Sequence, residues 1–170
     1  GKNQDVPLDI LVDSNLCAYV TGFTESPDFP VVNALQRTNA GRADCFLAKI
    51  DAGGTNFVYS TFLGGTNDDH AHSIALDAAG RVYLTGYTTS SDFPTTSGAY
   101  DSSLSGTQDA FVSALASGGG SLAFSSLYGG SGSERGSAIG LLPSGNIVFA
   151  GDTTSSDLPT RNAPQPLAGG

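Results

Sequence analysis

The 170-residue sequence contains no tryptophan and no methionine, only two cysteines, and only seven lysines and arginines. Its 16 acidic side chains give a formal net charge of −9. No stripe of basic residues is present that would neutralise a phosphate backbone or an anionic lipid surface. These absences exclude nucleic acid and an anionic membrane surface from the expected partners.

Long apolar runs are also missing, because no stretch approaches the roughly 18 residues that span a bilayer. We therefore expect no membrane insertion. The first residue is not methionine and no signal-like leader opens the chain, so we expect a mature or excised piece of a longer precursor. The 39% hydrophobic content is too high for a disordered linker, and the 23 glycines indicate a folded, loop-rich protein.

One motif occurs three times along the chain. TGFTESPDFPVV at 21–32 returns as TGYTTSSDFPTT at 85–96 and as AGDTTSSDLPTR at 150–161. Other segments repeat with the same period, such as DCFLAKI at 44–50 with DAFVSAL at 109–115. Such a period defines structural units rather than chemistry. The sequence divides into a half repeat at 1–22, interpreted as the C-terminal hairpin of a blade, units at 23–87 and 88–151, and a tail at 152–170.

Each unit carries four short runs rich in Val, Ile, Leu, Phe and Tyr, which are typical of β-strands. In the middle unit they cover 45–50, 57–63, 72–77 and 81–87, and a tight turn at Ala79-Gly80 predicts a hairpin. No segment has a helical period. Neither face of these strands is frankly polar, so each sheet needs neighbours on both sides. The expected fold is all-β, with about 2.5 four-stranded antiparallel meanders arranged like the blades of an incomplete propeller.

The residues that recur in every copy have architectural explanations. Gly22, Gly86 and Gly151 stand where positive φ or close backbone approach is needed. The aspartates of the D-F-P and D-L-P segments suit turns, the following apolar residue suits a hydrophobic plug, and the proline ends strand pairing. Turn formation is the favoured role for these aspartates, with metal ligation the alternative.

The tandem motifs resemble the SBBP repeat, a beta-propeller-type repeat of secreted and surface proteins of bacteria and archaea. The resemblance rests on D-A-F-V, Y-S-T-x-L-G-G, I-A-x-D-x-x-G-x-x-Y-x-T-G-x-T and D-F-P-T-T-x-G-A-Y, and covers about residues 9–162. It implies a propeller-like fold and an extracellular or cell-surface location, and it brings no catalytic residues. The third copy departs from the pattern at Asp152 and Pro143 and in its tail.

Candidate metal ligands are few. His70 and His72 stand two residues apart beside Asp68 and Asp69, and we expect them to project from one face. The alternative is a solvated junction of loop and strand. The segment GGTNDD at 64–69 offers oxygen ligands for Ca²⁺, although it does not fit an EF-hand loop. Neither pattern is strong enough to assign a metal, and we expect no cofactor.

The sequence also lacks a catalytic signature. SGSERG at 131–136 is not a G-x-S-x-G nucleophile elbow and does not join a strand to a helix. No cluster of acids and histidines stands out. We expect the protein not to be an enzyme.

Cys17 and Cys45 have no cysteine counterparts in the other copies. Their joint occurrence favours a disulfide, which suits an oxidising compartment. Both lie near the N-terminal ends of their strands, where antiparallel neighbours would hold them apart. An intrachain bond is predicted, and an interchain bond or two free buried thiols remain open.

The expected function is that of a structural or assembly subunit of an extracellular protein. A hairpin without its two companion strands exposes a strand edge, and the terminal sheets expose apolar faces. We predict association of copies through the N-terminal hairpin or the tail at 161–170, as a filament or a closed ring. The alternative is a binding or adhesion module for a ligand such as a surface glycan, which would use the loops at one end of the blades.

Overall fold

The computed structural model describes residues 1–165, and this part of the chain consists of ten β-strands joined by turns and loops. The prediction of an all-β protein is confirmed. The strands are β1 (Asp5–Val12), β2 (Ala18–Thr24), β3 (Asp44–Ile50), β4 (Phe57–Leu63), β5 (Asp69–Leu76), β6 (Val82–Thr88), β7 (Asp109–Leu115), β8 (Leu122–Tyr128), β9 (Glu134–Leu141) and β10 (Ile147–Thr153).

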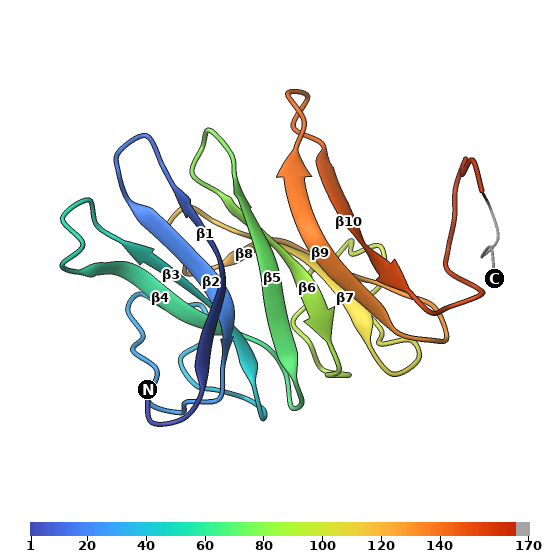
Figure 1. Ribbon diagram of the computed structural model, residues 1–170, viewed down its shortest axis with the longest axis horizontal. Coiled ribbons are helices and arrows are strands. Elements are labelled where there is room, and N and C mark those ends of the chain that lie inside the picture. Colours follow the sequence, from blue (N-terminus) through green and yellow to red (C-terminus); the bar gives the residue numbers. More distant parts are fainter. Residues whose placement is uncertain (166–170) are drawn as a thin grey trace.

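The strands form three antiparallel sheets that stand side by side in a row (Figure 1). Blade 1 has the order β1-β2-β3-β4, blade 2 has β5-β6-β7-β8, and blade 3 consists of the hairpin β9-β10. Strand β5 packs against β1 and β2, and β9 packs against β5 and β6. The row does not close into a ring. It is the incomplete, propeller-like array that the sequence predicts.

The predicted grouping of strands into blades is wrong by half a unit. Strand β2 pairs with β3 along its whole length, from Ala18 opposite Ile50 to Thr24 opposite Asp44. The short connection 64–68 between β4 and β5 instead carries the chain from one blade to the next. The N-terminal hairpin therefore begins a complete blade and β2 has no open edge, while the half blade lies at the other end. The period is the same for both groupings, so repetition alone does not distinguish them.

The recurrent glycine of the last strand in each unit is required by close backbone approach. None of the three has positive φ. A methyl group on Gly86 would lie 1.8 Å from the backbone oxygen of His70, and the corresponding distances at Gly22 and Gly151 are 1.9 Å and 2.0 Å. A β-bulge interrupts the register of each of these hairpins. The strands come too close there for any side chain larger than hydrogen.

The main core lies between blades 1 and 2. Side chains of the two sheets meet there in one buried cluster, which includes Leu47, Tyr59 and Leu63 of blade 1 and Val82, Leu84, Phe111 and Leu115 of blade 2. Phe93 of the D-F-P segment belongs to this cluster and acts as the predicted hydrophobic plug. The core is therefore an interface between blades, and a single blade would leave its apolar faces in water.

Loops cover the outer edges of the two complete blades. Val32 bridges to Ser60 at the edge of β4, and the Thr96 amide donates to the Ser125 carbonyl at the edge of β8. Covered edges of this kind prevent unwanted strand pairing. Strand β10 pairs only with β9 within residues 1–165, so its outer edge remains open. The tail predicted at 152–170 begins inside β10, and residues 166–170 of this tail lie outside the described part of the chain.

Candidate functional site

An acid begins the first strand of each blade, and it is buried in blades 2 and 3. In blade 2 the Asp69 carboxylate accepts hydrogen bonds from the Thr88 hydroxyl, the Ser90 hydroxyl (2.8 Å) and the Gly65 amide (2.7 Å). Glu134 makes the same three kinds of contact in blade 3. These hydrogen bonds hold the hairpin of the first two strands of the blade to the connection that enters the blade. The role of the acid is therefore structural.

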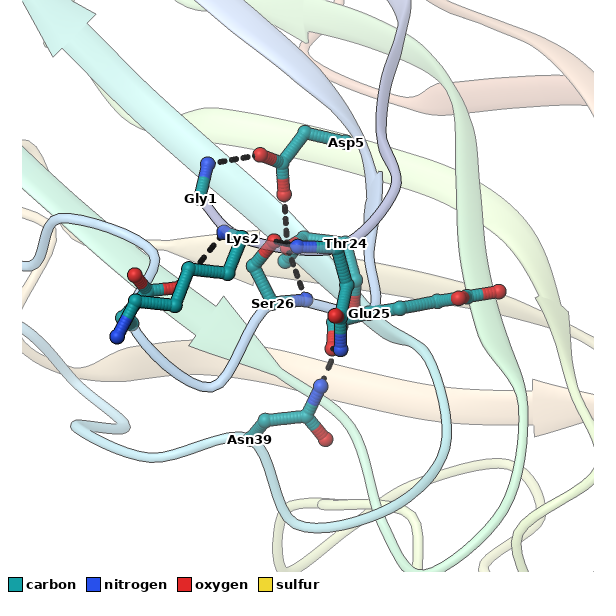
Figure 2. Close-up of polar contacts among 9 residues, drawn as sticks. Gly1, Lys2, Asp5, Thr24, Glu25, Ser26 and Asn39 are labelled. Atoms are coloured by element: carbon teal, nitrogen blue, oxygen red, sulfur yellow. Dashed lines mark hydrogen bonds and ion pairs between the residues drawn. The ribbon is translucent and has the colours of Figure 1, made fainter.

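Figure 2 shows the corresponding position in blade 1, where the Asp5 carboxylate lies between the Thr24 hydroxyl and the N-terminal ammonium of Gly1. The Ser26 amide donates to the Thr24 hydroxyl oxygen, and Asn39 donates to the Thr24 carbonyl. The N-terminus thus occupies the position that the connection between blades has elsewhere. The contact is exposed, unlike its buried counterparts.

A second acid faces the first across a glycine at the junction between blades 1 and 2. Asp44, at the start of β3, accepts hydrogen bonds through Oδ2 from the Gln36 side chain (2.7 Å) and the Ala40 amide (2.9 Å). Its Oδ1 is buried and has no hydrogen-bond partner. A methyl group built on Gly64 would lie 2.8 Å from this oxygen and 2.8 Å from Asp69 Oδ2. Burial and the charge of Asp69 raise the pKa of Asp44 to about 6.

The junction between blades 2 and 3 repeats this arrangement. Asp109 Oδ2 accepts from the Ser105 amide (3.0 Å), and Asp109 Oδ1 is again buried and unpartnered. A methyl group on Gly129 would lie 2.2 Å from that oxygen and 2.8 Å from Glu134 Oε2. Burial, with the charge of Glu134, raises the pKa of Asp109 to about 6. The unpartnered oxygen is therefore a property of the junction and not of one residue.

The aspartates of the D-F-P and D-L-P segments hold the connections between blades. Asp92 Oδ1 accepts from the amide (2.9 Å) and the hydroxyl (3.0 Å) of Thr66, and Asp157 does the same for Ser131. Asp28 accepts from the Lys2 amide (2.9 Å). These partners lie more than 20 residues away. Sequence reasoning found the structural role but placed it within the local turn.

The rings of His70 and His72 both lie against Tyr87, with centroids 4.8 Å and 5.5 Å from it, but their other contacts are on different blades. The His70 ring stacks on Phe23 of blade 1 with 3.8 Å between centroids, while His72 Nδ1 lies 3.0 Å from the Gly136 carbonyl oxygen of blade 3. The register shifts between Ala71 and Ser73, so His72 is the extra residue of a bulge and the alternation of faces is lost. Burial lowers the pKa of His70 to about 4, and the charge of His72 adds to this.

The predicted metal candidates are not assembled into one site. Asp69 is engaged by hydroxyl and amide donors, whereas Asp68 lies 3.5 Å from the Arg42 guanidinium. Within residues 1–165, no group of three or more His, Cys, Asp or Glu side chains is arranged to hold a metal ion. In GGTNDD, the hydrogen bonds of Thr66 and Asp69 organise the connection between blades.

The predicted intrachain disulfide is wrong, because both cysteines are free. Cys45 stands opposite Phe23 near the end of β2, whereas Cys17 immediately precedes β2. Six residues of extended strand separate them by about 20 Å, which is far beyond the roughly 7 Å that a disulfide allows between Cα atoms. The antiparallel register thus keeps the thiols apart.

We expect the two thiols to differ strongly in reactivity. Burial, with the charges of Asp69 and Asp44, raises the pKa of Cys45 well above its usual range, whereas Cys17 is partly exposed. Iodoacetamide should therefore label Cys17 of the native protein and reach Cys45 only in denaturant. Mass spectrometry of peptides labelled with and without denaturant measures both. Equal labelling of the native thiols would contradict the described burial.

The two ends of the blade row expose residues whose counterparts are buried inside it. Ile10 of β1 is 61% exposed, while its counterpart Ile74 of β5 is 7% exposed. At the other end, Val148 of β10 is 49% exposed, while its counterpart Tyr83 of β6 is 8% exposed. Sequence reasoning predicted apolar terminal faces and an unpaired edge at the N-terminal hairpin, where β1 pairs only with β2 among the described residues, but it missed the unpaired edge of β10. The correspondence between repeats identifies these residues directly.

An apolar groove lies beside the open edge of β10. It has a volume of about 240 Å³ and is bounded by Val112, Phe124 and Tyr128 of blade 2 and by Ile147 and Phe149 of blade 3. At the preceding junction, strand β7 places Phe111 and Leu115 in the corresponding space. The groove is thus the part of a blade junction that two further strands would fill.

Two complete antiparallel blades and a third hairpin, stacked without closing, place this chain in the class of propeller-like repeat proteins. Residues 58–94 match the SBBP family model, which is described as a beta-propeller repeat. The family resemblance of the sequence motifs is confirmed, and the matched segment runs from β4 through β6 across one blade junction. No curated protein matches the chain. The described residues contain no helix long and apolar enough to cross a membrane.

Proposed function

We propose that this chain is a non-catalytic structural subunit of an extracellular protein, and that its copies associate head to tail through the terminal blades. The observation that carries the proposal is the contrast between exposed residues at the two ends and their buried counterparts at the inner junction. A low content of charged residues and many small polar residues support the extracellular location. The structural roles of the repeated residues support the absence of catalysis.

The first contact surface is the outer face of blade 1. Ile10 and Val12 of β1 are exposed there, whereas Ile74 and Leu76 of β5 pack into the core against blade 1. This face therefore has the composition that blade 2 uses to pack on its predecessor. Burying such apolar area stabilises association by about 25 cal/mol per Å² before the entropic cost of association is subtracted.

The second contact surface is the outer face of blade 3. Val148 lies where Tyr83 stands in blade 2, and Tyr83 lies beside Leu141 and Leu142 of the following blade. The surface therefore corresponds to the face on which a following blade rests. It has lost its tyrosine but is still apolar at Val148.

These two surfaces are different and complementary, so the partner that fits each is a second copy of the chain. Blade 1 of one copy would rest on blade 3 of the next as blade 2 rests on blade 1. A contact between unlike surfaces produces a filament if its rotation does not close and a ring if it does. The open edge of β10 and the adjoining groove add a place where a neighbouring strand can pair.

A symmetric dimer through β10 is disfavoured by geometry. Antiparallel pairing of two β10 strands has its two-fold axis perpendicular to the sheet. The same face of both hairpins would then point to one side of the joined sheet, and blade 2 of each copy packs on that side. Blade 2 of one copy would therefore overlap with blade 2 of the other, which favours head-to-tail association.

Light scattering of the purified chain tests the proposal. We expect multimers at micromolar concentration and a monomer of 17.2 kDa for Ile10→Asp, because a buried unpaired charge costs several kcal/mol. Leu16→Asp is the matched control, since Leu16 lies in the β1–β2 turn, is 70% exposed and gives the same charge change. A wild-type chain that remains monomeric would reject self-association, and glycan binding by that monomer would support the adhesion alternative.

A further inference from the structure

Within residues 1–165, two buried carboxylate oxygens at the blade junctions have no hydrogen-bond partner. They belong to Asp44 and Asp109, and each lies across a glycine from a second carboxyl group, that of Asp69 or Glu134. An unpartnered buried oxygen that faces another carboxylate is unfavourable in its ionised form. The same defect at two equivalent junctions requires a physical explanation.

The surrounding donors are already in use. Asp44 Oδ2 binds Gln36 and Ala40, and the Asp69 carboxylate binds Thr88, Ser90 and Gly65. The charge that acts on Asp44 from the facing strand is that of Asp69, which is itself near Asp92. The Cys45 thiol lies close to both acids. Asp109 faces the negative charges of Glu134 and Asp101.

We propose that each junction holds one buried proton, carried by Asp44 and by Asp109, which joins the two facing carboxyl groups and makes blade packing tighter in mild acid. A protonated Asp44 Oδ1 is a hydrogen-bond donor, and the Asp69 carboxyl group is its acceptor in this proposal, because Asp44 Oδ1 and Asp69 Oδ2 each lie 2.8 Å from the position of a methyl group on Gly64. One proton thereby removes a negative charge and satisfies the unpartnered oxygen. The same holds for Asp109 and Glu134 across Gly129.

The direction of the pH effect follows from linkage. The usual pKa of an aspartate is 3.8, and the pKa of Asp44 in the folded protein is about 6. The folded state therefore holds the proton more tightly, so the stabilisation is present in acid and is lost as the pH rises through about 6. His70 acts in the opposite direction, since its pKa is lowered by folding to about 4. Comparing variants that retain His70 isolates the aspartate.

Urea unfolding of wild type and Asp44→Asn at pH about 4.5 and about 7.5 tests the proposal. The amide of asparagine can donate where the proton would, while its oxygen keeps the acceptor role toward Ala40. We expect the unfolding equilibrium constant of wild type, divided by that of the variant, to be about tenfold or more larger at the higher pH than at the lower pH. Asp109→Asn should act in the same way at the other junction.

Asp69→Asn is the matched control, because both Asp69 oxygens accept hydrogen bonds and an amide cannot replace them. It should be less stable than wild type at both pH values. Asp44→Asn could instead destabilise the protein as much as Asp69→Asn does and leave the pH dependence of the unfolding free energy equal to that of wild type. In that case Asp44 and Asp69 do not share a proton. Light scattering at each pH separates changes in association from changes in folding.

Two further measurements keep the proposal testable if a variant does not fold. Carbon NMR of the Asp44 carboxyl in the native protein should show a titration near pH 6. An aspartate that is fully ionised at pH about 5 would overturn the proposal. Stabilisation of wild type by Ca²⁺ or Na⁺ near neutral pH, absent in Asp44→Asn, would overturn it in favour of a cation between the carboxylates.

Discussion

Replacement of Gly86 with alanine is expected to abolish cooperative folding of the chain at room temperature. The added methyl group would lie 1.8 Å from the His70 carbonyl oxygen and 2.9 Å from the Ala71 Cα, so rigid backbone would have to move. This bulge lies in blade 2, which packs against both other blades. We expect a loss of about 4 kcal/mol or more, comparable with the whole stability of a small domain.

Urea denaturation followed by circular dichroism measures the effect. Gly140→Ala is the matched control, because Gly140 lies in β9 with ordinary φ and a methyl group there would have no atom within 4 Å. We expect that variant to unfold within about 0.5 kcal/mol of wild type. Similar stabilities of the two variants would show that close approach at the bulge is not what requires glycine.

Mixing two assembly-deficient variants is expected to restore a defined complex. Ile10→Asp blocks the face of blade 1 but leaves blade 3 intact, and Val148→Asp does the reverse. Each variant alone should be monomeric, because head-to-tail association needs both faces. Together they should form a one-to-one dimer that cannot grow, since its only free ends carry the aspartates.

Light scattering of the mixture at micromolar concentration measures this complex, and a labelled component in analytical ultracentrifugation gives its stoichiometry. Adding Leu16→Asp to either variant should leave the mass and the stoichiometry of the complex unchanged. If contacts were between like faces, Val148→Asp or Ile10→Asp would still associate alone and the mixture would gain no dimer. The experiment therefore separates head-to-tail from symmetric assembly without knowledge of the filament or ring that wild type forms.

The geometry of the candidate site explains where sequence reasoning was incomplete. The sequence pattern predicts turns at the recurrent aspartates, whereas Asp92 holds Thr66 of the connection that enters its blade. Nothing in the local pattern of Asp44 indicates that Asp69 will face it, because the two belong to different blades. Such a pair appears only when the junction is formed.

Local sequence determined the strands, the tight turns and the repeat period. Alternating apolar residues and glycine punctuation act over a few residues, so the hairpin turns at Gly80 and Gly145 follow directly, with φ of +79° and +84°. The family motifs likewise depend on short segments, and the match over 58–94 confirms them.

Tertiary structure alone decided which strands share a sheet, which edge stays open and which charged groups meet. A tandem repeat is unchanged when its starting point is shifted, so its period is compatible with a half blade at either end. Hydrogen bonding of β2 to β3 removes this ambiguity and places the half blade, with the unpaired outer edge of β10, at the C-terminal end of the row. The same antiparallel register separates Cys17 from Cys45, and packing of blade 2 on blade 1 brings Asp69 to Asp44, because these contacts depend on the relative placement of distant strands.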